Sequence, residues 1–579
     1  MERSSLLRWT LIGAAVFLFL QYGLPAISGK GTTSDLQPLA GIVDDSAAAE
    51  RRAEALCRIE GVRFVADLTT KGAALRRLAP TDAKYLAEDG KPTELVTTWI
   101  DSRLSLRTNL RAPTGTDQVA YDDLDWQLGE TTKTSCAFSY EDESVALTKT
   151  VRAGERPFEL DVSLTVKNKA AQARTHRLTV ENDEWRKQSE TQGSWGGQSE
   201  WLTQVVVRAE EATRREPGDF EPSDFDEPDF TDEKWRREPG APRWVAITST
   251  YFAKALVPVK SPSEPAGETL VEEVFDRARF HDKTDDPSFG HVYRARLNYG
   301  KAVLEPGATA SYELIAFAGP KEREVLAHAA GGDRSTIDLL DLGTFGGIGK
   351  LLIKYLYILF GFVGTWGWAI CLLTITVKVL LFPLSIAQIK STIAMRKLKP
   401  EMDALNERYK DDAQQKAVAL QELWRKNKVA NPMLGCLPAL LQMPVWFALY
   451  TSLQTAVELY HVPFGPFIPD LSAPGKYFII PVVLGGSSFI QQKLMPMQGD
   501  PLQQKMMLYM MPAIFTAMML FLPAGLGIYF LTNTWLGIAQ QVAMERYYKS
   551  QEGRAPVPAS ESADGGPKAK DFGKGNARV

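Results

Sequence analysis

The sequence is short of the residue types that build metal, nucleotide and disulfide-framework proteins. Its 579 residues include four cysteines and five histidines, with no CxxC and no HExxH pattern. No GxxxxGK[ST] loop for nucleotide phosphates is present. Carboxylates are numerous but unpatterned, so no catalytic pair of the kind used on carbohydrates stands out. We therefore expect neither an enzyme nor a bound metal or cofactor.

The four cysteines divide between two kinds of sequence. Cys371 and Cys436 lie in apolar runs, where we expect them to be buried as small hydrophobic side chains. Cys57 and Cys136 lie in a polar region and could form a disulfide if that region is extracytoplasmic. The sequence leaves this pairing open.

Charge is almost absent from long segments of the last third of the chain. Apart from Lys378, no Asp, Glu, Lys or Arg occurs in residues 355–389, 429–457, 477–492 and 506–544. Because about 20 apolar residues span a bilayer as a helix, these runs predict membrane helices. The last run is long enough for two, with LPAG (522–525) as the turn. The net charge of −4 is too small to indicate a nucleic-acid partner.

The N-terminus carries a further apolar stretch, residues 9–24, behind Arg3 and Arg8. This pattern is typical of a secretory signal peptide or of a signal anchor, and we favour an uncleaved anchor. Either interpretation leaves the N-terminus in the cytoplasm and places the following domain outside. With the anchor, the chain has six predicted membrane segments.

Loop charges predict the orientation. Residues 390–428 hold ten Lys and Arg residues, whereas residues 458–476 hold one. By the positive-inside rule the first loop is cytoplasmic and the second is outside, so both termini are cytoplasmic. Apolar residues recur in the first loop at Ile393, Leu398, Met402, Leu405 and Tyr409, and then at Val418, Leu420, Leu423 and Trp424. We expect two helices packed as a hairpin, interrupted at Pro400 and at Asp411–Asp412.

The polar region ahead of the membrane segments predicts β structure. Residues 159–168, 176–182, 201–209 and 244–252 carry β-branched and aromatic residues with partial alternation, which favours a β-sandwich of many strands. Residues 215–242 are acidic and rich in Pro and Phe, so we expect an excursion or loop that contributes nothing to the core. Residues 334–354 follow, where Lys350 and Lys354 among leucines indicate an amphipathic helix at the outer interface.

These patterns divide the chain into segments. In order they are an N-terminal transmembrane anchor (1–28), a polar linker (29–60), an extracytoplasmic β-sandwich domain (61–335), an interfacial amphipathic helix (336–357), a membrane segment (358–389), a cytoplasmic helical hairpin (390–428), four more membrane segments (429–457, 477–493, 505–522 and 524–545) and a disordered cytoplasmic tail (546–579).

Lys378 is the one charge within the first of these runs, residues 355–389. Apolar sequence continues well beyond it, so we do not expect it at a helix end. A lysine in the centre of a bilayer costs roughly 2.5–3.5 kcal/mol on insertion scales. Its ammonium group should therefore face a polar cavity, or reach the interface along its own flexible stem.

Several long stretches resemble those of the YidC-type membrane-protein insertases, and the resemblance covers residues 335–548. The stretches are FVGTWGWAI (362–370), TVKVLLFPL (376–384), NPMLGCLPALLQMPVWFALY (431–450), residues 500–533 and IAQQ (538–541). Residues 145–168 and 244–258 similarly resemble the outer domain of the long bacterial envelope members. The resemblance implies a multi-pass α-helical membrane protein, with an N-terminal anchor, a five-helix core and a large periplasmic β-sandwich (supersandwich-like), in the bacterial inner membrane.

The resemblance also implies a hydrophilic groove open to cytoplasm and lipid. The family places an arginine there, and this chain has Lys378, which keeps the charge but not the five-donor guanidinium fork. Thr374, one turn earlier, and Gln442 correspond to polar groove positions, and Phe530 stands where the family often has tyrosine. With Asn533 and Gln540, these side chains would line a half-channel that hydrates a polar tail part of the way across.

The resemblance implies an insertase and folding chaperone that works alone or with the Sec translocon. Its partners would be nascent membrane proteins, membrane lipid, and the ribosome and signal-recognition pathway through the cytoplasmic hairpin and the C-terminal tail. A transporter or channel with Lys378 as substrate counter-charge is the alternative. It predicts internal repeats and acidic residues in the spans, and the uncharged runs contain no Asp or Glu. An anchored envelope enzyme is a weaker alternative, because one span would anchor it.

Overall fold

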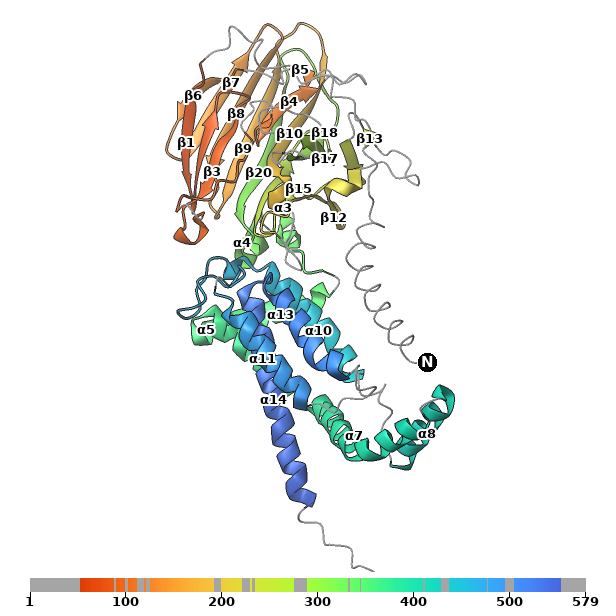
Figure 1. The fold of residues 1–579 in the computed structure, drawn as a ribbon. Coiled ribbons are helices and arrows are strands. Elements are labelled where there is room, and N and C mark those ends of the chain that lie inside the picture. Colours follow the sequence, from red (N-terminus) through yellow and green to blue (C-terminus); the bar gives the residue numbers. More distant parts are fainter. Residues whose placement is uncertain are drawn as a thin grey trace, which may run out of the picture.

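A computed structural model describes most of the chain between residues 53 and 552. The described ranges are 53–87, 90–98, 103–111, 119–120, 125–191, 199–220, 230–231, 235–274, 289–331, 334–343, 345–409, 412–427, 437–475, 477–494 and 504–552. The predicted anchor, most of the linker, Cys436 and the tail beyond residue 552 lie outside these ranges. Two parts follow one another along the chain, a β domain (53–331) and a helical domain (345–552) (Figure 1).

The β domain is a layered antiparallel structure of three sheets. The nine-stranded sheet has the order β12 (Ala212–Arg215), β11 (Gln204–Arg208), β15 (Trp244–Thr248), β16 (Phe252–Lys260), β20 (Thr309–Pro320), β9 (Glu159–Asn168), β8 (Val145–Ala153), β7 (Ser135–Glu141) and β6 (Gln127–Thr131). The eight-stranded sheet has the order β13 (Phe230–Thr231), β14 (Trp235–Glu238), β17 (Pro265–Val274), β18 (Gly290–Tyr299), β10 (Arg174–Lys187), β4 (Arg107–Arg111) and β5 (Val119–Ala120), with β19 (Ala302–Leu304) beside β10. The three-stranded sheet is β1 (Leu56–Gly61), β2 (Phe64–Thr69) and β3 (Ala74–Pro80).

Short helices fill the turns and lead out of the sheets. They are η3 (Ala83–Tyr85), α3 (Gln188–Thr191), η5 (Pro217–Phe220), α4 (Arg323–His328) and η7 (Ile337–Leu339).

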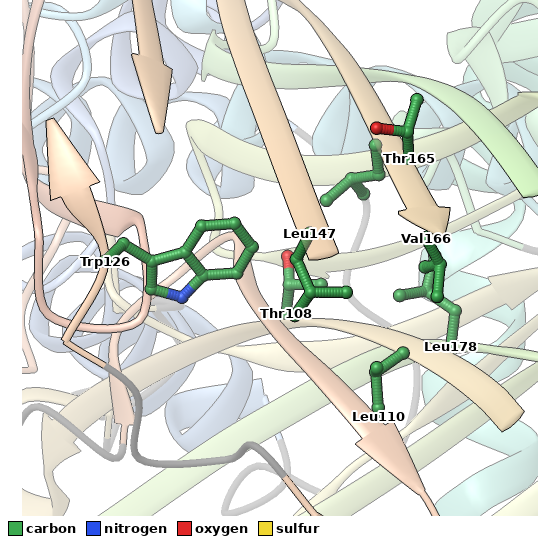
Figure 2. A pocket seen from close by; sticks show the side chains of 8 residues that line it. Thr108, Leu110, Trp126, Leu147, Thr165, Val166 and Leu178 are labelled. Carbon is green, nitrogen blue, oxygen red and sulfur yellow. The ribbon is translucent and has the colours of Figure 1, made fainter. Parts of the chain in front are cut away.

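Alternation of apolar and polar residues sets the faces of these strands. In β9, for example, Leu160, Val162, Leu164 and Val166 are buried. This period of two puts every second side chain between the sheets. Where the two large sheets meet, Gly267 of β17 lies against Val207 and Val245, and its missing side chain allows the close approach. Figure 2 shows a small cleft at this inter-sheet layer, with Trp126 on one side and Leu110, Leu147 and Leu178 on the other.

Cys57 and Cys136 form a disulfide that ties β1 to β7, with their Cα atoms 6.2 Å apart. This settles the pairing that the sequence left open. Cys371 is a free, half-buried cysteine.

The expectation that residues 215–242 contribute nothing to the core is wrong for residues 235–238. They form β14, which pairs with β17, and Trp235 is 1% exposed. The guanidinium groups of Arg296 and Arg294 lie 3.7 and 4.7 Å from the ring centre of Trp235. Cation–π contact with two buried arginines stabilises this one aromatic strand within an otherwise polar segment.

The helical domain follows. Its elements are α5 (Gly346–Val363), α6 (Trp366–Leu380), α7 (Phe382–Arg408), α8 (Ala413–Lys426), α10 (Leu437–Gln454), η8 (Val457–Leu459), α11 (Ile479–Leu494), the π turn η9 (Met506–Met510), α13 (Met511–Met519) and α14 (Ala524–Glu552). In Figure 1, α10, α11 and α13 lie between the β domain and the hairpin of α7 and α8, α14 continues downward past the level of the hairpin, and α5 runs crosswise to α11 and α14. Of the described helices, α5 alone is long and apolar enough by itself to cross a membrane, while α6 and residues 506–519 are shorter apolar helices.

The α7–α8 hairpin confirms the two predicted helices but not the predicted interruption at Pro400. Helix α7 continues through Pro400 to Arg408. Helix α8 begins at Ala413, and Asp412 caps it by accepting hydrogen bonds from the backbone N–H groups of Gln414 and Gln415, each at 3.0 Å. Apolar contacts join the two helices, between Met395, Leu398 and Met402 on one side and Leu420, Leu423 and Trp424 on the other.

Candidate functional site

Lys378 lies in the last turn of α6, which corrects the expectation that it does not stand at a helix end. Helix α6 ends at Leu380, and α7 begins two residues later with Pro383 in its first turn. Proline is accommodated in a first helical turn but ends a preceding helix, so the apolar sequence beyond Lys378 belongs to a new helix. A cation in the last turn of a helix is stabilised by the helix dipole.

Two other helices reach the end of the Lys378 side chain. A Cβ atom on Gly537 of α14 would lie 3.8 Å from Lys378 Nζ and 2.8 Å from Gln491 Nε2 of α11. The missing side chain of Gly537 therefore leaves room for the ammonium group and the Gln491 amide to share one space. Lys378 and Gln491 are both half-buried. Among the described residues, no charged partner contributes to the environment of Lys378.

Helix α14 presents two more polar side chains on the Gly537 face. Asn533 and Gln540 stand four residues before and three residues after Gly537, the spacing that places residues on one helix face, and both are half-buried. We call Lys378, Gln491, Gly537, Asn533 and Gln540 the Lys378 site. Gln442 lies in α10, but its side chain is outside the described residues.

Two of the residues expected beside Lys378 lie in the apolar core instead. Thr374 is 1% exposed, and its hydroxyl donates to the carbonyl of Ile370 at 2.8 Å, so its hydrogen bond is made within its own helix. Phe530 is buried, with its ring centre 5.2 Å from that of Phe515 and 5.9 Å from that of Trp446. Both residues support the helices that carry the site, and a groove-lining role for them stays a prediction.

Sequence reasoning missed Gln491 and Gly537. Gln491 is the first of two glutamines at the end of an uncharged run, and it lies one helical turn after Ser487. The indole N–H of Trp535 in α14 donates to Ser487 Oγ at 2.8 Å, so the two helices are joined by a hydrogen bond beside the site. The polar QQ pair was the available signal for Gln491. A glycine within an apolar run gave no signal for Gly537.

The opposite ends of these helices are closed by backbone hydrogen bonds. The N–H groups of Ala524 and Gly525, at the start of α14, donate to the carbonyls of Ala473 and Leu471 at 2.9 and 2.8 Å. Their partners lie in the connection between α10 and α11. The structure thus has a polar site toward one end of the helices and a hydrogen-bonded cap at the other.

The arrangement offers a positive charge, amide groups and a small open space within an apolar helix group. It can attract a carboxylate and replace part of the hydration of a polar chain. Among the described residues, no group of three or more His, Cys, Asp or Glu side chains is placed to hold a metal.

Comparison with known proteins agrees with both parts of the chain. Residues 57–355 match the family model described as YidC periplasmic domain, which is more than half of the chain. Residues 358–552 match the model described as 60Kd inner membrane protein. The chain belongs to the YidC family. It is therefore similar to inner-membrane proteins with a periplasmic domain, and the β domain is that domain.

Curated relatives carry the name membrane protein insertase YidC. The protein of Anaeromyxobacter dehalogenans is 39% identical over 329 residues, which cover 55% of this chain and 54% of the relative. That of Paraburkholderia phymatum is 40% identical over 304 residues, covering 52% and 51%. The chain thus spans about half the length of the curated relatives it matches.

Solved structures are more distant. A crystal structure of YidC from Thermotoga maritima is 13% identical, covers 84% of this chain and 98% of its own, and has a TM-score of 0.29. An active YidC insertase with its first transmembrane domain resolved is 18% identical, covers 85% and 93%, and has a TM-score of 0.36. An aldose 1-epimerase homologue from Escherichia coli K12 is 12% identical and covers 46% of this chain and 99% of its own, with a TM-score of 0.29.

Proposed function

We propose that this protein is a membrane-protein insertase and folding chaperone whose Lys378 site receives the polar segments of nascent membrane proteins. The observation that carries the proposal is the place of Lys378, half-buried where α6, α11 and α14 meet, beside Gln491 and the open space at Gly537. The names of the relatives support it.

The depth of the site supports a half-channel open to the cytoplasm. Lys378 is 12 residues beyond Trp366, the first residue of α6. At a rise of about 1.5 Å per residue, Lys378 lies roughly 18 Å from the periplasmic end of α6. This is more than halfway from the periplasmic to the cytoplasmic side of a hydrocarbon core of about 30 Å. A polar tail drawn from the cytoplasm to Lys378 would then have a shorter dry distance left to cross. The apolar helix of the substrate supplies the net free energy as it enters lipid, so no nucleotide is needed.

Exposed aromatic side chains support the position proposed for the periplasmic boundary of the bilayer. The five side chains are more than half exposed: Phe362 in the last turn of α5, Trp368 in the first turn of α6, and Phe467, Tyr477 and Phe478 in the connection between α10 and α11. Aromatic side chains gather at membrane interfaces, where their rings meet the headgroup region. We propose six spans with both termini in the cytoplasm and α5 at the outer interface.

The partners follow from this orientation. The α7–α8 hairpin, with its lysines and arginines, would lie in the cytoplasm and contact the ribosome and the signal-recognition pathway together with the C-terminal tail. Nascent membrane proteins are the substrates, membrane lipid receives their helices, and the Sec translocon is a partner for some of them.

Complementation tests the proposal in cells depleted of their own insertase. Wild type is compared with Lys378→Ala and Lys378→Arg, and the readout is insertion of a single-span substrate with an acidic translocated tail. We expect Lys378→Arg to insert the substrate and Lys378→Ala to fail at equal protein level, because the charge is what attracts the tail. Lys354→Ala, which removes an exposed lysine of α5, is the matched control and should insert normally.

Normal insertion by Lys378→Ala would remove the charge from the mechanism and leave apolar contact as its basis. Failure of the well-expressed wild type would contradict the insertase function itself and favour a transporter with Lys378 as counter-charge.

A further inference from the structure

The connection between α10 and α11 inserts into the core of the β domain. Val457 and Tyr460 are 0% and 3% exposed and belong to the same apolar cluster as the β-sandwich residues. The Tyr460 ring centre lies 4.9 Å from that of Tyr251, 5.9 Å from that of Phe252 and 6.2 Å from that of Tyr85. Separating the two domains would expose these side chains, so the contact is strongly favoured by the hydrophobic effect.

Glu458 lies between these two buried residues and joins three segments by hydrogen bonds. Its carboxylate accepts from the Tyr357 hydroxyl of α5 and, at 3.3 Å, from the backbone N–H of Arg323 at the start of α4. Its backbone carbonyl accepts from Lys84 Nζ at 3.2 Å. One residue thus connects α5 and the loop after α10 to two different parts of the β domain.

An ion pair between Glu322 and Arg63 fixes the part of the β domain that contacts Glu458. Glu322 accepts from both terminal nitrogens of Arg63, at 2.7 and 2.8 Å, and from the Tyr85 hydroxyl at 2.5 Å. Burial works to raise the pKa of Glu322, but the hydrogen bonds from Arg63 and Tyr85 outweigh it and hold the pKa below its usual value. Because Lys84 precedes Tyr85 and Arg323 follows Glu322, this pair holds both β-domain partners of Glu458 in place.

The end of helix α10 is held as well. The Tyr251 hydroxyl donates to the carbonyl of Gln454, the last residue of α10, at 3.3 Å. The Arg323 guanidinium donates to the carbonyl of Lys350 in α5 at 3.2 Å. Both helices therefore have contacts with the β domain in addition to those made through Glu458.

We propose that the base of the β domain is a fixed brace on the outer ends of α5 and α10, and that Glu458 is the positioning residue that locks it. The domain then does not swing on a linker but moves as one body with these helix ends. The consequence for insertion rests on the proposed function: a substrate opens the helices at their cytoplasmic ends while the brace keeps their outer ends closed.

Distances between the domains test the brace in the full chain. Spin labels are placed at Val303→Cys in the β domain and Leu351→Cys in α5, both exposed, in a background with Cys371→Ser and Cys436→Ser. We expect a narrow distance distribution by pulsed electron spin resonance in lipid nanodiscs. Glu458→Ala should broaden it and shift it to longer distances. Glu458→Gln should stay narrow, because its amide oxygen still accepts from Tyr357 and Arg323.

The control is Glu313→Ala, which breaks an exposed ion pair with Lys260 within the β domain and should leave the distribution unchanged. Tyr357→Phe, which keeps the ring and removes one hydrogen bond to Glu458, provides a milder variant that should broaden it partly. A broad distribution in wild type, or one that stays narrow in both Glu458→Ala and Tyr357→Phe, would overturn the brace. Neither result bears on insertion, so the brace can fail while the proposed function stands.

Discussion

The identity of the charged residue decides what the Lys378 site recognises. A lysine ammonium is a strongly hydrated point charge on a flexible stem, whereas a guanidinium makes planar, paired hydrogen bonds. The Gln491 amide and the Lys378 ammonium group both lie against the open space at Gly537. We infer that the site attracts negative charge without fixing its geometry, which suits a surface that receives many different polar tails.

A buried lysine in the β domain gives a prediction about pH. Lys149 is 0% exposed, and its Nζ donates to the Leu106 carbonyl and to Thr108 Oγ1, as many bonds as a neutral amine can donate. Burial lowers its pKa to about 7 from the usual 10.5 of a lysine. Between these two values the unfolded chain binds the proton and the folded chain does not, so stability rises with pH across this window and is constant below it.

Lys149→Met should therefore reduce the rise in unfolding free energy between about pH 7 and about pH 9.5. Lys321, whose pKa is also lowered to about 7 by burial, contributes in the same direction and leaves part of the slope. Denaturant unfolding of both proteins at the two pH values measures the difference. An unchanged slope in Lys149→Met would show that Lys149 stays protonated in the folded protein.

Charge and polarity made part of the Lys378 site predictable from single residues. Lys378 stands out because it is alone in a long apolar run, and Asn533 and Gln540 follow from their polarity. Gly537 could not be found this way, since its contribution is an absent side chain. For Thr374 the groove-lining role stays a prediction, since its buried hydroxyl donates to the carbonyl one turn earlier in its own helix.

At the scale of elements, small residues set how closely the helices pack. A Cβ atom on Gly485 of α11 would overlap Thr516 Oγ1 of α13, whereas one on the neighbouring Gly486 would meet nothing within 4 Å. The two glycines are thus a matched pair, one at a helix contact and one facing open space.

Gly485→Val should force α11 and α13 apart and lower the thermal unfolding midpoint of the helical domain, at a cost of about 1–3 kcal/mol for overpacking. Gly486→Val should leave the midpoint nearly unchanged. Thermal unfolding of the full chain in detergent, followed by circular dichroism, compares them. Equal effects of the two substitutions would contradict the packing of α11 against α13.

Elements with a strong period were predictable, and those fixed by distant partners were not. The alternation in residues 159–168 gave β9 with its observed bounds. Strand β14 was hidden because its stability comes from Arg294 and Arg296, about 60 residues away in the sequence. The continuation of α7 through Pro400 depends on its packing against α8, which composition does not reveal.

At the scale of the whole molecule, the disulfide links β1 of the three-stranded sheet to β7 of the nine-stranded sheet. Cys57 and Cys136 are separated by 79 residues, and such a link constrains the unfolded chain. Replacing both with serine should destabilise the β domain by about 2–4 kcal/mol. The measurement is its thermal unfolding with and without a phosphine reductant. A wild type that does not respond to the reductant would show that the bond adds no stability.

The central claim is that polar substrate segments pass Lys378, and site-specific photocrosslinking tests it most directly. A photoreactive amino acid is placed at Gln491, beside Lys378, or at Val482, on the exposed face of the same helix. Ribosome-bound chains of a single-span substrate, stalled with the acidic tail part of the way across, are then irradiated. The account predicts that the tail crosslinks to position 491 and not to position 482, and that Lys378→Ala weakens the crosslink. A tail that crosslinks only at position 482, or at neither position while insertion proceeds, would contradict it.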